Sequence, residues 1–255
     1  MERITIFTMP RSFEHPFTML QLNAIRSWLS LEPTPEVILC GNDEGVAEAA
    51  AELHLVHIPE IKLSPSGAPL IDSVFDEARS VAKNPILACV NADIILMQDF
   101  LETLGRVNVT FPHKFMIVGQ RWDLDVDKYI DFSDNSWAGK FRSEVAKNGK
   151  LHPSCGIDYF VFEKENNIHM LPFPVGRTCW DNWFMAQALH IGLDVVDATE
   201  EIVAVHQNHR QYHMQEYMNN RTGVESKLCQ ELAQENIASV SNAKWKFVQS
   251  ILTRK

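Results

Sequence analysis

The chain has 255 residues, of which 45% are hydrophobic and 22% are charged, enough for one sizeable core in a globular protein. Its formal net charge of -10 argues against a nucleic-acid binder and against docking on an anionic membrane, because both would require a basic face. Five scattered cysteines without a CxxC pair favour a reducing compartment over a disulfide framework. Since the sequence has no signal pattern and no membrane-spanning apolar run, we expect a cytoplasmic protein without an integral membrane segment.

The first hundred residues alternate between strand-like and helix-like patterns. Strand patterns lie at residues 3–9, 36–40, 55–58 and 86–90, and helical patterns lie between them at 17–31, 46–53 and 70–83. This alternation is typical of parallel strands joined by right-handed helical crossovers. We therefore expect an α/β fold with a mostly parallel central sheet flanked by helices, and a nucleotide-binding half over residues 1–100.

The second half of the chain has a less regular pattern. Short strand patterns lie at residues 114–119, 156–163, 194–198 and 202–206, and a helical pattern lies at 181–190. Residues 121–151 are polar and rich in Asp. We expect residues 101–213 to form a smaller mixed lobe that closes over the sheet. From residue 224 to the end we expect two amphipathic helices, so that residues 214–255 form a helical C-terminal part.

The most informative stretch is residues 85–97. An apolar run at 86–90 is typical of a strand buried on both faces, and Asn91 and Asp93 follow it. Ligands bind at the carboxyl ends of strands in open α/β sheets, where these two side chains would point the same way. A desolvated carboxylate is costly unless a cation or hydrogen-bond donors satisfy it, so Asp93 is a candidate ligand contact. The alternative is a strand-terminating turn, in which Asn and Asp are ordinary residues.

By the order of these elements, residues 3–213 resemble the GT-A glycosyltransferases, which use nucleotide-diphosphate sugars. Asn91-Ala92-Asp93 resembles the family's DXD motif, with Asn in place of the first Asp. In that motif the last carboxylate ligates a divalent cation that bridges the donor's diphosphate. Residues 202–210 resemble the strand that carries the family's C-terminal metal-ligating histidine. The resemblance implies Mn²⁺ or Mg²⁺ held by Asp93 and His206, with His209 as second choice. Strand-end histidines bonded to backbone are the alternative.

Two further segments carry the resemblance. Residues 154–162 resemble the glycine loop and strand that shape the donor-sugar pocket, where Gly156 permits close approach and Asp158 accepts hydrogen bonds from sugar hydroxyls. The alternative for this segment is the start of a hairpin with a solvated Asp. Residues 176–183 resemble the acidic motif at a helix N-terminus where inverting enzymes place the general base. This implies that Asp181 is the base, and the alternatives are a helix cap or an acceptor ligand.

The remaining implied contacts are to the donor and the acceptor. Arg177 would meet a phosphate or an acidic sugar, and the indoles of Trp180 and Trp122 would stack on sugar rings. The stretch 121–151 is either the place of acceptor contacts or a polar surface insertion. The family reads base and ribose from the loops after the first two strands, and here those loops carry Thr8, Arg11, Asn42 and Asp43 in addition to Asn91 and Asp93. Turn chemistry alone is the alternative for Asn42 and Asp43.

The resemblance thus implies one GT-A domain over residues 1–255 and a metal-dependent glycosyltransferase of the hexosyltransferase type (EC 2.4). It would move a sugar from a UDP- or GDP-sugar to a hydroxyl of a glycan or glycoconjugate, with inversion through Asp181. The alternatives are a retaining glycosyltransferase of the same fold, a sugar-1-phosphate nucleotidyltransferase and a non-catalytic nucleotide- or glycan-binding relative. Residues 9–13 lack the Gly-rich basic loop typical of nucleotidyltransferases, and Asn91 keeps the non-catalytic relative open.

Overall fold

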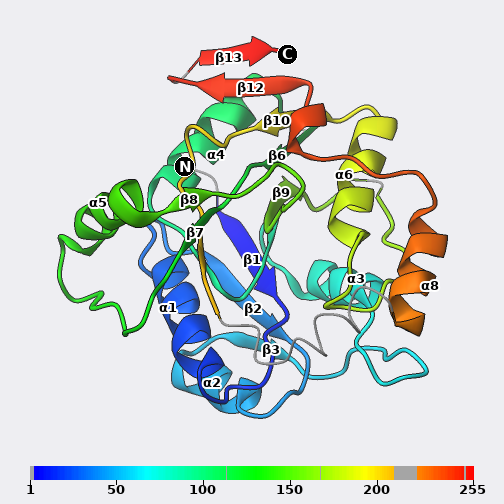
Figure 1. Cartoon of the computed structure of the whole chain (residues 1–255), viewed down its shortest axis with the longest axis horizontal. Helices are drawn as coiled ribbons and strands as arrows, with labels where there is room; N and C mark the ends of the chain where they lie inside the picture. The colour runs from blue at the N-terminus through cyan, green and yellow to red at the C-terminus, as the bar shows by residue number, and fades with distance from the viewer. Residues whose placement is uncertain (1–2, 113, 167, 210–222, 250) are drawn as a thin grey trace.

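The structure is a computed structural model that describes residues 3–112, 114–166, 168–209, 223–249 and 251–255. A nine-stranded sheet in the order β13-β12-β10-β6-β9-β4-β1-β2-β3 runs through its centre (Figure 1). One half of this sheet is parallel and comprises β1 (Ile4–Thr8), β2 (Glu36–Cys40), β3 (Val56–Ile58) and β4 (Ile86–Val90). These strands are those that the apolar runs of the first hundred residues predict.

The second half of the chain continues the same sheet. β9 (Tyr159–Glu163) lies antiparallel between β4 and β6 (Phe115–Val118), and β10 (Asp194–Asp197) pairs in parallel with β6. The sheet is therefore mostly parallel. Every residue of β1, β4 and β6 is buried, as expected for strands covered on both faces.

Helices cover both faces of the large sheet. α3 (Ile71–Val81), α6 (Trp180–His190) and α8 (Val224–Ala233) pack on one face. α1 (Phe17–Leu29), α2 (Val46–Glu52) and α4 (Asp99–Thr110) pack on the other. Because side chains alternate along a strand, Phe7 of β1 joins the first core whereas Ile4 and Ile6 join the second. The expected α/β class, a mostly parallel sheet flanked by helices, is confirmed.

A second, four-stranded sheet lies at the carboxyl end of β4. Its order is β5-β11-β7-β8, with β5 (Ile94–Ile95), β11 (Val205–Gln207), β7 (Trp122–Leu124) and β8 (Lys150–Leu151). α5 (Trp137–Asn148) joins β7 to β8, so the polar stretch 121–151 forms part of this sheet and its helix. The sheet has its own small core of Ile95, Leu124, Val145 and Val205. It brings together segments that lie far apart in the sequence.

The prediction of two C-terminal helices is half wrong. α8 is the first of them, but a short 3-10 helix η1 (Val240–Asn242) and a hairpin of β12 (Trp245–Val248) and β13 (Ile251–Arg254) replace the second. β12 pairs in parallel with β10. The backbone N–H and C=O groups at the edge of β10 thereby gain hydrogen-bond partners that a second helix would not have supplied. The predicted boundary between residues 213 and 214 lies outside the described residues. None of the helices that the structure describes is long and apolar enough to cross a membrane.

Candidate active site

A cleft of ≈ 740 Å³ opens where β1, β2 and β4 end. This is the end of the sheet at which ligands bind in open α/β proteins, and the volume lies within the usual range for small-molecule sites. Most of the sequence-predicted site residues line this cleft: Arg11, Asp43, Asn91, Asp93, Gly156, Asp158, Arg177, Trp180, Asp181 and His209. Segments separated by more than a hundred residues therefore supply one cavity.

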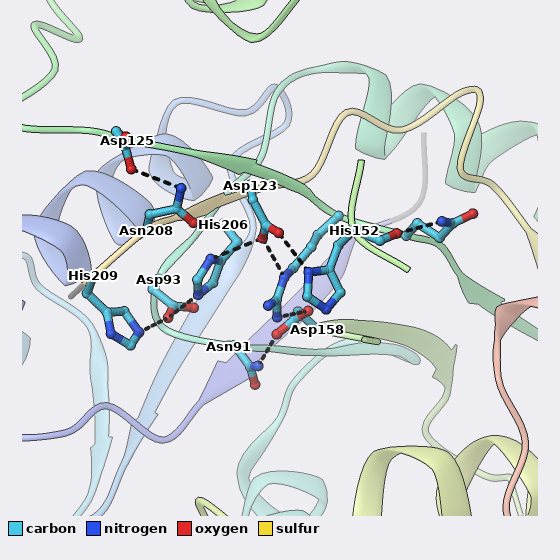
Figure 2. A network of polar contacts seen from close by, with 11 residues as sticks. Asn91, Asp93, Asp123, Asp125, His152, Asp158, His206, Asn208 and His209 are labelled. Atoms are coloured by element: carbon cyan, nitrogen blue, oxygen red, sulfur yellow. Dashed lines mark hydrogen bonds and ion pairs between the residues drawn. The ribbon is translucent and has the colours of Figure 1, made fainter. Parts of the chain in front are cut away.

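Asp93 and two histidines converge at one edge of the cleft. His206 Nε2 lies 3.3 Å from Asp93 Oδ2, and His209 Nε2 lies 3.6 Å from the same oxygen (Figure 2). The small sheet produces this meeting, because Asp93 precedes β5 and His206 belongs to β11, and the two strands are paired. One ligand atom from each of the three residues lies within 4.8 Å of the others.

This cluster fits a divalent cation. Asp93 Oδ1 is buried and has no hydrogen-bond partner among the described residues, so one carboxylate oxygen is left for a further ligand. Burial acts to raise the pKa of Asp93, but hydrogen bonds and charge interactions with His206 and His209 outweigh it and hold that pKa well below its usual range. The carboxylate is thus ionised. A carboxylate and two imidazoles form a donor set that divalent metal ions accept.

A second group of polar residues adjoins the cluster and includes three that the sequence prediction missed. Arg121 Nη1 donates to Asp158 Oδ2 at 2.6 Å, and Arg121 Nε donates to Asp123 Oδ1 at 3.0 Å. His152 Nδ1 lies 2.7 Å from Asp123 Oδ2. Partial burial acts to raise the pKa of Asp123, but His152 and Arg121 outweigh it and lower that pKa. Arg121 and His152 also line the cleft. In the sequence, Arg121 and Asp123 belong to the polar stretch 121–151 and His152 follows it directly, but only the structure gives the strand register that brings them together.

The Asn at position 91 has a defined partner. Asn91 Nδ2 donates to Asp158 Oδ1 at 2.6 Å, while Arg121 occupies the other oxygen of Asp158. An Asp at position 91 would place two carboxylates in contact at this point, which is unfavourable unless one is protonated. The amide is therefore the side chain that suits Asp158.

Asp181 lies in the first turn of α6 and lines the cleft. Burial raises its pKa to about 7, and nearby Asp158 acts in the same direction, while backbone N–H groups of residues 181 and 182 oppose the shift. The residue at the N-cap position is Cys179, which has a φ of 86° and makes no side-chain cap bond. Asp181 is thus placed to exchange a proton with a group in the cleft near neutral pH.

Arg177 and Trp180 are two other predicted residues that line the cleft, and both have partners within the protein. Arg177 Nη2 lies 2.7 Å from Glu225 Oε2 on α8, so its charge is already paired. The Trp180 ring packs against Phe75 and Phe160 of the core, with ring centroids 6.4 Å and 5.8 Å away, and also lines the cleft. Trp180 therefore both packs against the core and borders the cleft.

The remaining predicted residues are Thr8, Asn42, Trp122 and Gly156. Thr8 is buried at the end of β1, Asn42 is exposed beside the cleft-lining Asp43, and Trp122 is half-buried against the small core. A Cβ at Gly156 would lie 2.4 Å from the His152 ring, so the missing side chain makes room for that imidazole. The ligand-binding roles of all these residues stay predictions.

Comparisons with known proteins give one informative result. No family model matches the chain, and no curated protein matches it. Among solved structures, that of S. aureus TarS residues 1–349 in complex with UDP-GlcNAc superposes with a TM-score of 0.54 and 11% sequence identity. The match covers 83% of this chain and 60% of the TarS chain. The chain therefore shares the fold of this part of TarS. At this identity the likeness concerns the fold, and the chain spans less than two thirds of the TarS chain.

Proposed function

We propose that this protein is a metal-dependent glycosyltransferase that moves a sugar from a nucleotide-diphosphate sugar to a hydroxyl group of an acceptor. The supporting observation is the convergence of Asp93, His206 and His209 at the edge of a ≈ 740 Å³ cleft at the carboxyl ends of the strands. The fold adds support, because TarS shares it and was solved with UDP-GlcNAc.

The three converging residues would hold Mn²⁺ or Mg²⁺. When bound, the cation would neutralise the charge that builds on the diphosphate leaving group as the anomeric C–O bond breaks. Mg²⁺ prefers oxygen ligands throughout, so two imidazoles favour Mn²⁺ over Mg²⁺. Burial acts to lower the pKa of His206, but Asp93 outweighs it and raises that pKa. The cation must displace this proton, so its affinity is expected to increase with pH.

The other parts of the cleft suit the remaining parts of a donor. Arg11 and Asp43, from the loops after β1 and β2, would contact the base and ribose, with Thr8 and Asn42 as neighbours. Asp158, fixed by Asn91 and Arg121, would accept hydrogen bonds from hydroxyls of the donor sugar. We take a UDP- or GDP-sugar as the donor class.

Asp181 would act as the general base for the acceptor hydroxyl. It lines the same cleft, and with a pKa of about 7 it accepts a proton at neutral pH and is still ionised in a useful fraction of molecules. A base of this kind leads to in-line displacement and inversion at the anomeric carbon. A retaining glycosyltransferase requires no such base. The effect on turnover of removing the Asp181 carboxylate therefore distinguishes an inverting enzyme from a retaining one. The acceptor would be a glycan or glycoconjugate hydroxyl.

Ligand-induced thermal stabilisation tests the proposal. UDP-, GDP-, CMP- and dTDP-sugars are each added with Mn²⁺ or with EDTA, since a ligand at 100 times its Kd adds about 2.7 kcal/mol to the free energy of unfolding. We expect one class of donor to raise the Tm with Mn²⁺ and to lose most of this effect in EDTA. The donor should then release nucleoside diphosphate slowly in the presence of Mn²⁺.

Variants make the test specific to the site. His206→Ala should abolish the metal-dependent part of the Tm shift, whereas His190→Ala, at the exposed end of α6, should retain it. If no sugar nucleotide stabilises the protein, or if EDTA makes no difference, the proposal is wrong. Pyrophosphate formation from a nucleoside triphosphate and a sugar-1-phosphate would identify a nucleotidyltransferase instead, and donor binding without any turnover would identify a non-catalytic relative.

A further inference from the structure

We propose that Asp123 is a positioning residue for the metal site, which holds the His206 ring so that Nδ1–H faces Asp123 and Nε2 faces the cation. This inference rests on the proposed metal site of Asp93, His206 and His209. It assigns a role to a residue of the polar stretch 121–151 that does not itself face the cation.

The strand register places Asp123 directly beside His206. β7 and β11 run in parallel, and Asp123 is the register partner of His206, whose other neighbour across β5 is Ile94. The two ring nitrogens of His206 point to different carboxylates: Nδ1 lies 3.4 Å from Asp123 Oδ1, and Nε2 lies 3.3 Å from Asp93 Oδ2. Figure 2 shows the imidazole between the two acids.

The surroundings of His206 leave Asp123 as the partner of Nδ1. The side chain of His206 is only 13% exposed, and Nδ1 is buried without a hydrogen bond to any described residue. A buried ring nitrogen without a partner is unfavourable, and the 3.4 Å gap to Asp123 closes with a small ring rotation. In metal sites the second ring nitrogen of a ligating histidine usually donates to a carboxylate, which fixes the tautomer and orients the other nitrogen.

Asp123 is itself held on both oxygens. Arg121 Nε donates to Oδ1 at 3.0 Å, and His152 Nδ1 lies 2.7 Å from Oδ2. Arg121 is anchored in turn by its 2.6 Å bond to Asp158. The Asp123 carboxylate is therefore fixed before any cation arrives, so His206 loses little freedom when it ligates the metal.

Mn²⁺ titration of the full chain, followed by EPR of the free ion, tests the inference. Titrations use Mn²⁺ alone and Mn²⁺ with saturating UDP. We expect Asp123→Asn and Asp123→Ala to weaken Mn²⁺ binding about 10- to 100-fold, as loss of such outer partners does in other metal sites. Pulsed EPR should detect two ligating nitrogens in the wild type and fewer in Asp123→Ala, a signature that a general loss of stability would not produce.

Asp125→Asn is the matched control. Asp125 follows β7 two residues after Asp123, is exposed and accepts a bond from Asn208 at 3.0 Å, so the substitution removes the same charge. It should change Mn²⁺ affinity less than about twofold, because the exposed charge is screened. Asp123→Asn keeps the shape of the side chain and remains informative if Asp123→Ala does not fold.

The outcomes separate the two proposals. If the wild type binds Mn²⁺ through two nitrogens and both Asp123 variants bind it equally well, the positioning role is wrong and the metal site stands. If Asp125→Asn weakens binding as much as Asp123→Asn, net charge explains the effect and the positioning role is again wrong. If the wild type binds no Mn²⁺ with or without UDP, the metal site fails and the role of Asp123 fails with it.

Discussion

The two sheets of this molecule differ in what their residues contribute. The large sheet supplies most of the hydrophobic core, and the small sheet carries polar residues of the candidate site. The central strands of the large sheet are mostly apolar and buried, and β4 and β9 carry almost only core residues. The strands of the small sheet are two or three residues long and carry Asp123 and His206, and among the described residues the buried core of this sheet comprises Ile95, Leu124, Val145 and Val205. Polar residues are thus concentrated where few apolar contacts hold the backbone. The salt bridges and hydrogen bonds among them are what fixes the site.

The largest expected effect comes from the small-sheet side of the cleft. Asp93→Asn should lower the rate of nucleoside diphosphate release about 10³-fold, since a cation at the leaving group is worth several kcal/mol. Mn²⁺ binding by EPR should be lost, and the Tm in EDTA should also fall, because the Asp93 carboxylate pairs with His206 and His209. Asp43 also lines the cleft but does not belong to the cluster of Asp93, His206 and His209, so Asp43→Asn should retain Mn²⁺ binding. Full activity of Asp93→Asn would show that the cluster is not catalytic.

The second-largest effect concerns Asp181 on α6, a helix that packs on the large sheet. Asp181→Asn should lower kcat at least about 10²-fold without changing Mn²⁺ affinity, since a general base contributes at least that much. In the wild type, kcat/KM should fall as the pH drops below about 7, where Asp181 becomes protonated. His152→Ala is the companion variant, because His152 also lines the cleft and pairs with Asp123. A larger loss of kcat in His152→Ala than in Asp181→Asn, with Mn²⁺ affinity unchanged, would transfer the base role to His152.

The same carboxyl makes a prediction about stability. The folded pKa of Asp181, about 7, lies above the ordinary value of 3.8, so the folded state retains a proton that the unfolded state releases. The contribution of this group is therefore present below pH 3.8 and is lost as the pH rises through about 7. We expect Asp181→Asn to raise the Tm relative to the wild type at pH 8 and to have little effect at pH 4. An equal shift at both pH values would contradict the raised pKa.

A core substitution in the large sheet should affect only stability. Leu87 of β4 is fully buried, and Leu87→Ala should lower the free energy of unfolding by about 2–5 kcal/mol. Urea unfolding measures this loss. At a temperature where the variant is folded, its Mn²⁺ affinity should equal that of the wild type. Weaker Mn²⁺ binding by Leu87→Ala would mean that core packing in the large sheet also affects the metal site. Stability and chemistry would then not be separated between the two sheets.

The smallest effect should come from Asn91→Asp, at the boundary of the two sheets. The new carboxylate would meet Asp158, so the free energy of unfolding in EDTA should fall by about 1–2 kcal/mol at neutral pH and recover in acid. Asn208→Asp is the matched control, because it also places a carboxylate beside an Asp, namely Asp125, but at an exposed site. It should cost less than about 0.5 kcal/mol.

The sequence predicts the large sheet well and the small sheet only in part. Long apolar runs such as 86–90 specify buried strands locally, so their place in the fold follows from order alone. α4 was not predicted, although Phe100, Leu104 and Val107 have helical spacing, because its pattern merges with the apolar run before it. Trp245 and Phe247 share one face of β12. So short a segment has no pattern that distinguishes a strand from a helix, and its pairing with β10 makes it a strand.

For the site, the sequence indicates a position near the cleft best where a side chain follows a strong strand, and the roles of these residues stay predictions. Asp93 is the clearest case, since it ends the run 86–90, and His206 lies near the end of a recognisable strand pattern. Arg121, Asp123 and His152 were missed because their partners are set by the register of β7 against β11 and β8. β7 and β11 lie about eighty residues apart in the sequence, and β7 and β8 about thirty, so no local pattern encodes either register.

The contact between Glu225 and Arg177 has a consequence for how the molecule is made. Glu225 binds Arg177 on the cleft wall at 2.7 Å and also accepts hydrogen bonds from Ser64 and Ser66 of the loop before α3. A ribosome delivers α8 only after every described segment that lines the cleft has been synthesised. The nascent chain therefore carries every described cleft-lining residue before Glu225 can pair with Arg177, so this ion pair forms only after the cleft's own residues have been synthesised.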